Sequence, residues 1–291
     1  QGDADKDGTM LQNALAGFST AMAALPDAIS FSFITGVSPL NGIWAGVFMG
    51  LSAALVGGRP GMVSSASAAT AVVLADISTN KDYGMGWMGL TVFMVGIIQL
   101  IMGAFRLSRF ITMVPHPVML GFVNGLAITM IKAQMRQYHV NGDGPWVQKE
   151  IIIGMTITAI FAMLAAVAWS RIPRASKILP APLASVILTA VFSIVFEKLV
   201  PRRTLHDVAG SHTFAGGRST LPSWNFPPAG VDWGDTAKLF HVFSIAVRFA
   251  IVGILESLMT SSLIDQITST SGSGRRECFG QGVGNILSSF F

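Results

Sequence analysis

Charged residues are scarce in this chain. Asp, Glu, Lys and Arg make up only 12% of its 291 residues, while 51% are hydrophobic and the mean hydropathy is +0.59. Soluble domains carry about 25% charged residues. The composition therefore excludes an ordinary soluble protein and predicts an integral membrane protein that crosses the bilayer several times.

Cysteine is almost absent, and the five histidines are scattered. The single cysteine, Cys278, excludes an internal disulfide, and no Cys or His spacing suits zinc. The glycine-rich stretch 57–61 lacks the Lys-Ser/Thr pair of a P-loop. No nucleophile and base occur together, and the basic residues fall in short loops between apolar runs. We therefore expect no enzyme activity, no nucleic-acid partner, and no metal or other cofactor.

Long apolar runs dominate what is present. Nine segments are apolar enough for membrane-spanning helices, which need about 20 such residues, and none has the period-two alternation of a barrel strand. They predict an all-α polytopic membrane protein with about nine helices and the lipid bilayer as its surroundings. The segments are about 11–35, 39–57, 62–77, 85–105, 113–133, 151–170, 181–199, 241–267 and from about 277 onward.

The loops between these segments indicate an orientation. Alternate short loops carry basic residues with almost no acid, and such loops are usually cytoplasmic. A cytoplasmic N-terminus would place the long loop 201–240 outside, and we expect a multi-pass protein of the plasma or inner membrane. The basic residues of the predicted inner loops are Arg59, Arg106, Arg109, Arg171, Arg174, Lys177, Arg275 and Arg276.

The third segment is short and consists mainly of Ser, Ala and Thr. Small residues allow close packing between membrane helices. Short, Gly/Pro-interrupted segments also mark transporter binding sites, where the unpaired N–H groups of a helix N-terminus suit an anion. The sequence leaves both interpretations open. In the second, the helix is broken, and hydroxyls of Ser64, Ser65, Ser67 and Thr70 could add donors.

Glu256 lies inside the apolar run 242–263. A carboxylate within a membrane span is costly and usually faces a protein cavity or pathway. Glu256 is thus either a structural acid paired with another helix or a coupling site for a proton or cation. Thr260 is four positions further and shares its helix face. We expect Asp265 to be a structural acid at the inner interface, near Arg275 and Arg276.

Several stretches together resemble the SulP family, the sulfate permease-like anion transporters that include prestin and the cyanobacterial bicarbonate transporters. The matches keep their order from about Leu11 to the last residue, and the ordered set is more specific than any one of them. The stretches are Ala23–Phe31, Gly36–Leu40, Gly57–Ser64, Val114–Ile128, Glu256–Thr260 and Glu277–Ile286.

The resemblance implies a seven-plus-seven inverted-repeat transporter fold, present here in part, with a short broken third helix. On that scheme residues 1–10 are a cytoplasmic tail, 11–110 hold core helices one to four, and 111–200 hold gate helices five to seven. Residues 201–240 form an extracellular loop, and 241–291 begin the second repeat. Helix ten and the cytoplasmic STAS domain of the family would lie outside this sequence, so we expect the piece alone not to transport. Relatives imply a homodimer.

The resemblance also implies a site. Ser67 and Ala68 match the substrate-facing residues of helix three, with Ser65 and Thr70 beside them. Glu256 takes the acidic position of helix eight and Thr260 its hydroxyl partner. Sodium-coupled bicarbonate transporters of the family carry Asp there, so Glu favours proton coupling or sodium-independent exchange.

The function expected is secondary active transport of an inorganic oxyanion, sulfate or bicarbonate, by alternating access. It would be coupled to H⁺ or Na⁺ or run as anion exchange. Two alternatives stay open: a nucleobase permease of the same fold, and a truncated, non-transporting membrane protein.

Overall fold

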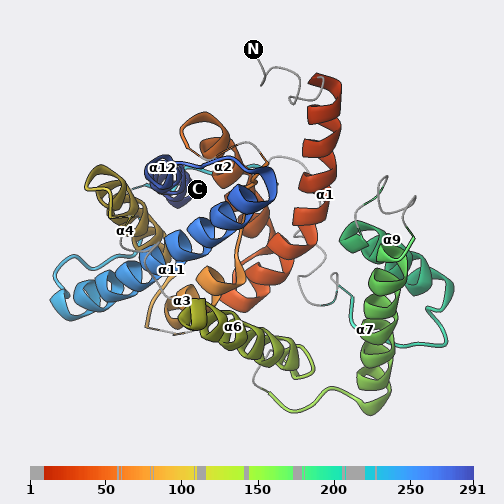
Figure 1. The fold of residues 1–291 in the computed structure, drawn as a ribbon. Helices are drawn as coiled ribbons and strands as arrows, with labels where there is room; N and C mark the ends of the chain where they lie inside the picture. Colours follow the sequence, from red (N-terminus) through yellow and green to blue (C-terminus); the bar gives the residue numbers. More distant parts are fainter. Residues whose placement is uncertain are drawn as a thin grey trace. The chain divides into compact units, whose positions relative to one another are not determined.

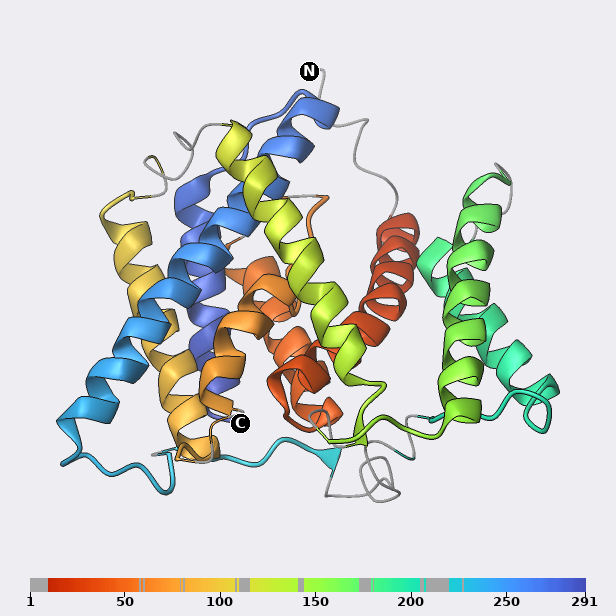
Figure 2. The same ribbon diagram turned by 90° about the horizontal axis from the view of Figure 1, so that it is seen from below.

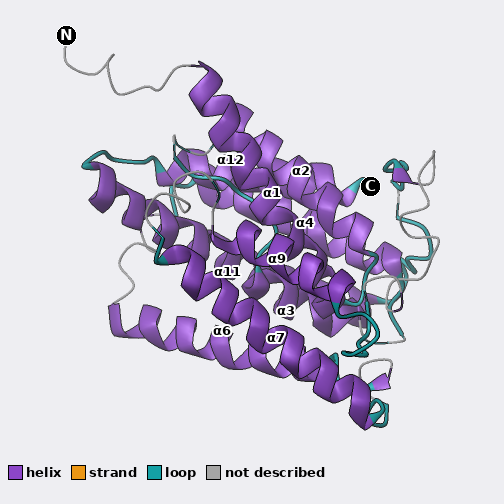
Figure 3. Ribbon diagram, turned by 90° about the vertical axis from the view of Figure 1, so that its right-hand side faces the viewer, coloured by secondary structure: helices purple, strands orange, loops and turns teal. Residues whose placement is uncertain are grey.

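The structure, a computed structural model, describes residues 10–57, 59, 61–78, 80, 82–107, 109, 116–140, 144–172, 179, 181–204, 207, 220–226 and 228–291. Helices dominate these residues, and His139 and Trp146 form an isolated β-bridge (Figure 3). The all-α prediction is thereby confirmed. The N-terminal tail up to residue 9, Gly58, Pro60, Arg174 and Lys177 lie outside the described residues.

The helices of the described residues coincide with the nine apolar segments. Four of them are long and apolar enough to cross a membrane: Asn13–Thr35, Met85–Ala104, Lys149–Ser170 and Thr236–Thr268. The full bounds are α1 (Met10–Thr35), α2 (Pro39–Leu55), α3 (Ala68–Ser78), α4 (Met85–Ala104), α6 (His116–Arg136), α7 (Lys149–Ser170), α9 (Ala181–Val195), α11 (Thr236–Thr268) and α12 (Gly274–Ser289).

Local sequence explains where several helices begin and end. Pro39 opens α2, a position where its missing N–H costs nothing. The Asp235 side chain accepts a 3.0 Å hydrogen bond from the Lys238 N–H and caps α11. At the other end of α11, Ser269 adopts the left-handed conformation, with φ 54°, which turns the chain back into α12.

The third apolar segment is helical only in its second half. Residues 62–67 have no regular secondary structure, and α3 begins at Ala68. The prediction of a short, broken third helix is confirmed, although its helical part starts six residues later than the apolar run. We refer to residues 62–67 as the entry segment.

The chain divides into two compact units. The first comprises Gln1–Pro26 and Gln134–Ser211, and the second comprises Asp27–Ala133 and His212–Phe291. In the first unit α7 packs against α9: the Phe161 and Phe192 rings stack at 4.4 Å, and the Ser185 hydroxyl donates to the Ala162 carbonyl at 2.7 Å. The cavity and polar clusters described below belong to the second unit.

In the second unit α12 packs between α2 and α4, while α11 packs on α3 and α4 (Figures 1 and 2). Close packing depends on glycine. A Cβ added to Gly282 would lie 2.9 Å from the Gly96 carbonyl oxygen of α4, and one on Gly284 would lie 2.5 Å from the Met49 sulfur of α2. Small residues of this kind let membrane helices approach closely. The packing places α11 and α12 beside the entry segment.

Candidate functional site

A cavity of about 550 Å³ lies within the second unit. Its wall combines parts of α1, α2, α3, α4, α11 and α12 with the entry segment and residues 220–225. Five of the predicted site residues line it: Ser65, Ser67, Thr70, Glu256 and Thr260. The sixth, Ala68, is buried and is not one of the lining residues.

Ser67 joins the beginning of α3 to α11. Its carbonyl oxygen accepts a 3.0 Å hydrogen bond from the Ala71 N–H, which makes Ser67 the residue just before the helix. Its hydroxyl donates to Oε2 of Glu256. The Thr70 hydroxyl, one turn further, donates to the Ser67 carbonyl at 3.1 Å. The start of the short helix and the carboxylate of the long helix therefore meet inside the cavity wall.

Thr260 lies one turn from Glu256, as its spacing predicts. Its hydroxyl donates to the backbone carbonyl of Glu256 at 3.1 Å rather than to the carboxylate. The carboxylate instead accepts from Ser67, which is 189 positions away in the chain. Helical spacing predicts that Thr260 lies close to Glu256, whereas the contact between Ser67 and Glu256 depends on the tertiary fold.

A second carboxylate, Glu277 of α12, is buried behind the cavity wall, with 3% of its surface exposed. Its Oε1 accepts from the Ser257 hydroxyl and from the Gln281 side-chain amide, the latter at 3.2 Å. Gln281 also donates to the Ser64 hydroxyl at 3.2 Å, which fastens the entry segment to α12. The sequence did not predict a site role for Glu277 or Gln281, although the two are one helical turn apart.

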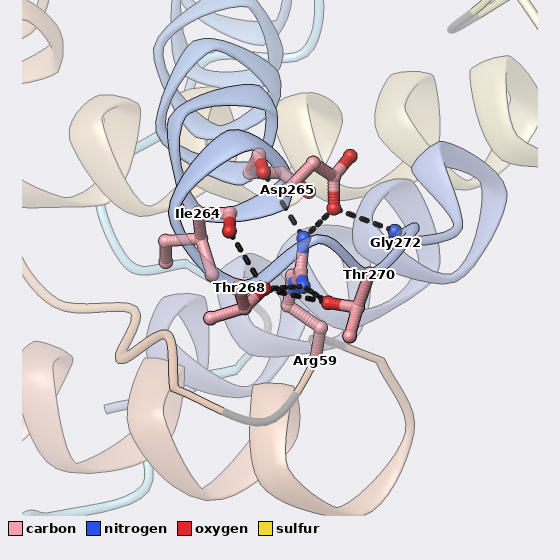
Figure 4. Close-up of polar contacts among 7 residues, drawn as sticks. Arg59, Ile264, Asp265, Thr268, Thr270 and Gly272 are labelled. Carbon is pink, nitrogen blue, oxygen red and sulfur yellow. Dashed lines mark hydrogen bonds and ion pairs between the residues drawn. The ribbon is translucent and has the colours of Figure 1, made fainter.

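Asp265 is predicted to be a structural acid near Arg275 and Arg276, and among the described residues its ion-pair partner is a different arginine. It forms an ion pair with Arg59, whose guanidinium reaches the C-terminal end of α11 (Figure 4). After the left-handed turn at Ser269, the Gly272 N–H also donates to Asp265 Oδ1, at 2.9 Å.

The geometry suits a small anion beside a proton- or cation-accepting carboxylate. The N–H groups in the first turn of a helix have no intrahelical acceptor and carry the positive end of its dipole. At α3 this turn opens at the cavity wall, next to the hydroxyls of Ser65, Ser67 and Thr70. Glu256 supplies the only carboxylate that the described lining residues contribute.

Comparison with known proteins gives consistent matches. The model of the sulfate permease family matches residues 10–291. "Putative sulfate transporter YbaR" of Bacillus subtilis is 34% identical over 284 residues, which are 98% of this chain and 54% of YbaR. "Bicarbonate transporter BicA" of Picosynechococcus is 26% identical over 293 residues, covering 94% of this chain and 49% of BicA.

A solved structure is also similar. The transmembrane domain of a cyanobacterium bicarbonate transporter BicA has a TM-score of 0.74 and 26% sequence identity, and the match covers 98% of this chain and 74% of that one. The sequence matches and the structural match both show that the chain is an integral, multi-pass membrane protein. It spans about half the length of the curated relatives that it matches.

Proposed function

The chain belongs to the sulfate permease family, and on that basis we propose that the complete protein carrying it moves an inorganic oxyanion across a membrane. Sulfate and bicarbonate are the leading substrates. The observation that carries the proposal is the junction of the α3 N-terminus with Glu256 in a cavity wall. An oxyanion would accept hydrogen bonds from first-turn N–H groups of α3 and from the hydroxyls of Ser65, Ser67 and Thr70.

Transport would proceed by alternating access, with helices of the core moving against helices of the gate. We propose a cytoplasmic N-terminus, a plasma or inner membrane location and a homodimer for the complete protein. The relatives described above are named as sulfate and bicarbonate transporters, which favours transport over catalysis and over the nucleobase and non-transporting alternatives.

Glu256 would couple the anion to a proton or to Na⁺. Two unit charges 4 Å apart repel by about 4 kcal/mol at an effective dielectric constant of 20. An ionised Glu256 therefore opposes an anion bound at the start of α3, and a proton on the carboxylate removes that repulsion. The two ligands then favour each other's binding, which is the thermodynamic basis of symport.

The first test is anion binding by the complete protein. Purified in detergent, it should show a raised melting temperature with sulfate or bicarbonate, since a ligand at 100 times its Kd adds about 2.7 kcal/mol to the stability of the folded state. Chloride, dicarboxylates and uracil complete the panel. Stabilisation by uracil alone would favour the nucleobase alternative.

The second test concerns coupling. Uptake into proteoliposomes should depend on pH, and Glu256→Gln, which cannot ionise, should flatten that dependence. Glu150→Gln makes the same chemical change at an exposed residue in the first turn of α7 and should leave the pH profile as it is. An unchanged profile in Glu256→Gln, or an equal change in Glu150→Gln, would count against coupling through Glu256.

A further inference from the structure

Arg59 binds the C-terminal end of α11 through most of its guanidinium (Figure 4). Nη1 donates to the Ser261 carbonyl at 3.1 Å and forms the ion pair with Asp265. Nη2 donates to the hydroxyls of Thr268, at 3.3 Å, and Thr270. Only 8% of the Arg59 side chain is exposed. A loop residue is thus held at four places on one helix end and the turn after it.

The turn after α11 is shaped to admit this side chain. A Cβ on Gly272 would lie 2.7 Å from the Ser261 hydroxyl oxygen and 3.1 Å from Cδ of Arg59. The Gly272 N–H meanwhile donates to the same Asp265 oxygen that pairs with Arg59. Glycine at this position therefore leaves space for the Arg59 side chain, while its backbone N–H gives Asp265 a second hydrogen-bond donor.

Arg59 and Asp265 lie at fixed distances along the chain from the candidate site. Arg59 precedes Ser67 by eight positions, and Asp265 follows Glu256 by nine within the continuous helix α11. One segment of chain runs from Arg59 to Ser67, and the other runs back along α11 from Asp265 to Glu256. The two segments are joined at one end by the ion pair and at the other by the Ser67–Glu256 hydrogen bond. Because α11 is one continuous helix between Glu256 and Asp265, holding Arg59 on its end determines where the chain enters the entry segment.

We propose that Arg59 and Asp265 are positioning residues for the anion site. By holding the start of the entry segment on α11, they align Ser67 and the first turn of α3 with Glu256. The inference rests on the proposed function only for the identity of the ligand. The clamp itself, defined as Arg59 with Asp265, is a property of the second unit.

The chemistry of the clamp favours alignment over stability alone. An ion pair adds little net stability at a partly exposed site such as this one, where 33% of the Asp265 side chain is exposed. A planar guanidinium instead fixes direction, because its fork of donors matches acceptors at set angles. Nε of Arg59 is buried and has no hydrogen-bond partner among the described residues. An unsatisfied buried donor lowers the stability of the folded state, so stability alone does not explain this contact.

The test measures anion uptake by the complete protein in proteoliposomes, with rates divided by the amount of folded protein. Arg59→Ala and Asp265→Asn should each raise the KM for the anion by about tenfold, equivalent to about 1.4 kcal/mol, with a smaller change in maximal rate. The two changes together should cost less than the sum of their separate effects, since both remove the ion pair between Arg59 and Asp265. The reversal, Arg59→Asp with Asp265→Arg, should recover part of the affinity.

Two further variants act as matched comparisons. Arg59→Lys keeps the charge but lacks the fork, so its KM should fall between those of wild type and Arg59→Ala. Arg276→Ala removes the same charge from an exposed residue at the start of α12 and should leave KM within about twofold of wild type. Should Arg59→Ala fail to fold, Arg59→Lys and the reversal still decide the question.

A cross-linking measurement reports alignment without transport. A Cβ on Gly253 of α11 would lie 3.4 Å from the Thr70 methyl of α3, close enough for a disulfide between cysteines at these positions. In a Cys278→Ala background, Thr70→Cys with Gly253→Cys should cross-link rapidly under mild oxidation. Adding Arg59→Ala should slow the reaction several-fold, and adding Arg276→Ala should not.

The outcomes separate the two proposals. Unchanged KM and unchanged cross-linking in Arg59→Ala overturn the positioning role, as does an equal effect of Arg276→Ala. A wild type that takes up no anion, together with cross-linking that depends on Arg59, overturns the proposed transport function and supports the clamp.

Discussion

At the scale of single residues, the carboxylates of Glu256 and Glu277 have different surroundings. Glu256 lines the cavity and accepts from the Ser67 hydroxyl. Glu277 is buried and accepts from Ser257 and Gln281, both neutral. A group at a cavity wall can exchange a proton or cation with what enters the cavity, whereas a buried group with neutral donors serves mainly to hold those donors in place. We therefore assign Glu277 to the support of the site.

This assignment predicts a loss of stability when Glu277 is removed. Glu277→Ala leaves the donors of Ser257 and Gln281 without their buried acceptor, which should lower the free energy of unfolding by about 1–3 kcal/mol. Glu277→Gln keeps a side-chain oxygen as acceptor and should lose less. The measurement is the melting temperature of the complete protein in detergent. Equal melting temperatures for wild type and Glu277→Ala would contradict the supporting role.

The contrast between these residues also shows what sequence can predict. Glu256 stands out because it interrupts an apolar run, and Thr260 follows from helical spacing. Glu277 follows two arginines at the start of its segment, so nothing in its surroundings marks it as buried. Gln281, which donates to Glu277, also donates to Ser64, 217 positions away from it in the chain, and contacts of that range depend on tertiary packing.

At the scale of elements, hydropathy predicts where helices lie but not where each begins. The predicted run 85–105 became a helix at Met85–Ala104, because an apolar span has its ends at the membrane surface. The run from residue 62 became a helix only from Ala68. Ser and Ala are compatible with both helix and irregular chain, so the break depends on bonds such as that of Ser67 with Glu256.

Packing of α12 on α4 gives the next prediction. A Cβ on Gly96 of α4 would lie 2.7 Å from the Gly282 carbonyl oxygen and 2.9 Å from the Ile286 nitrogen. Both are backbone atoms of a helix, which cannot yield as a side-chain end can. Gly96→Ala should therefore lower the free energy of unfolding by about 1–3 kcal/mol, seen as a lower melting temperature in detergent.

Gly121→Ala provides the comparison for that change. Gly121 lies within α6, and a Cβ there would meet no described atom within 4 Å. Alanine favours the helix over glycine by about 1 kcal/mol, so this variant should melt at the wild-type temperature or above it. A loss at Gly121 equal to that at Gly96 would show that helix composition, rather than the α4–α12 contact, sets the effect.

At the scale of the whole molecule, the family and the multi-pass fold follow from the ordered motifs and apolar runs, and the matches over residues 10–291 confirm both. The division into core and gate helices stays a prediction. The polar contacts among Arg59, Ser67, Glu256 and Asp265 lie within one compact unit. The site and its proposed clamp therefore belong to the same compact unit.

The last prediction concerns the orientation of the chain in the membrane. The basic loops predict a cytoplasmic N-terminus, so Thr204 in the long loop should lie outside and Ser271, between α11 and α12, inside. Both are exposed, and the native Cys278 is buried. In a Cys278→Ala background and right-side-out vesicles, an impermeant maleimide should label Thr204→Cys directly and Ser271→Cys only after permeabilisation. The reverse pattern would invert the topology and place the Arg59 clamp at the outer surface.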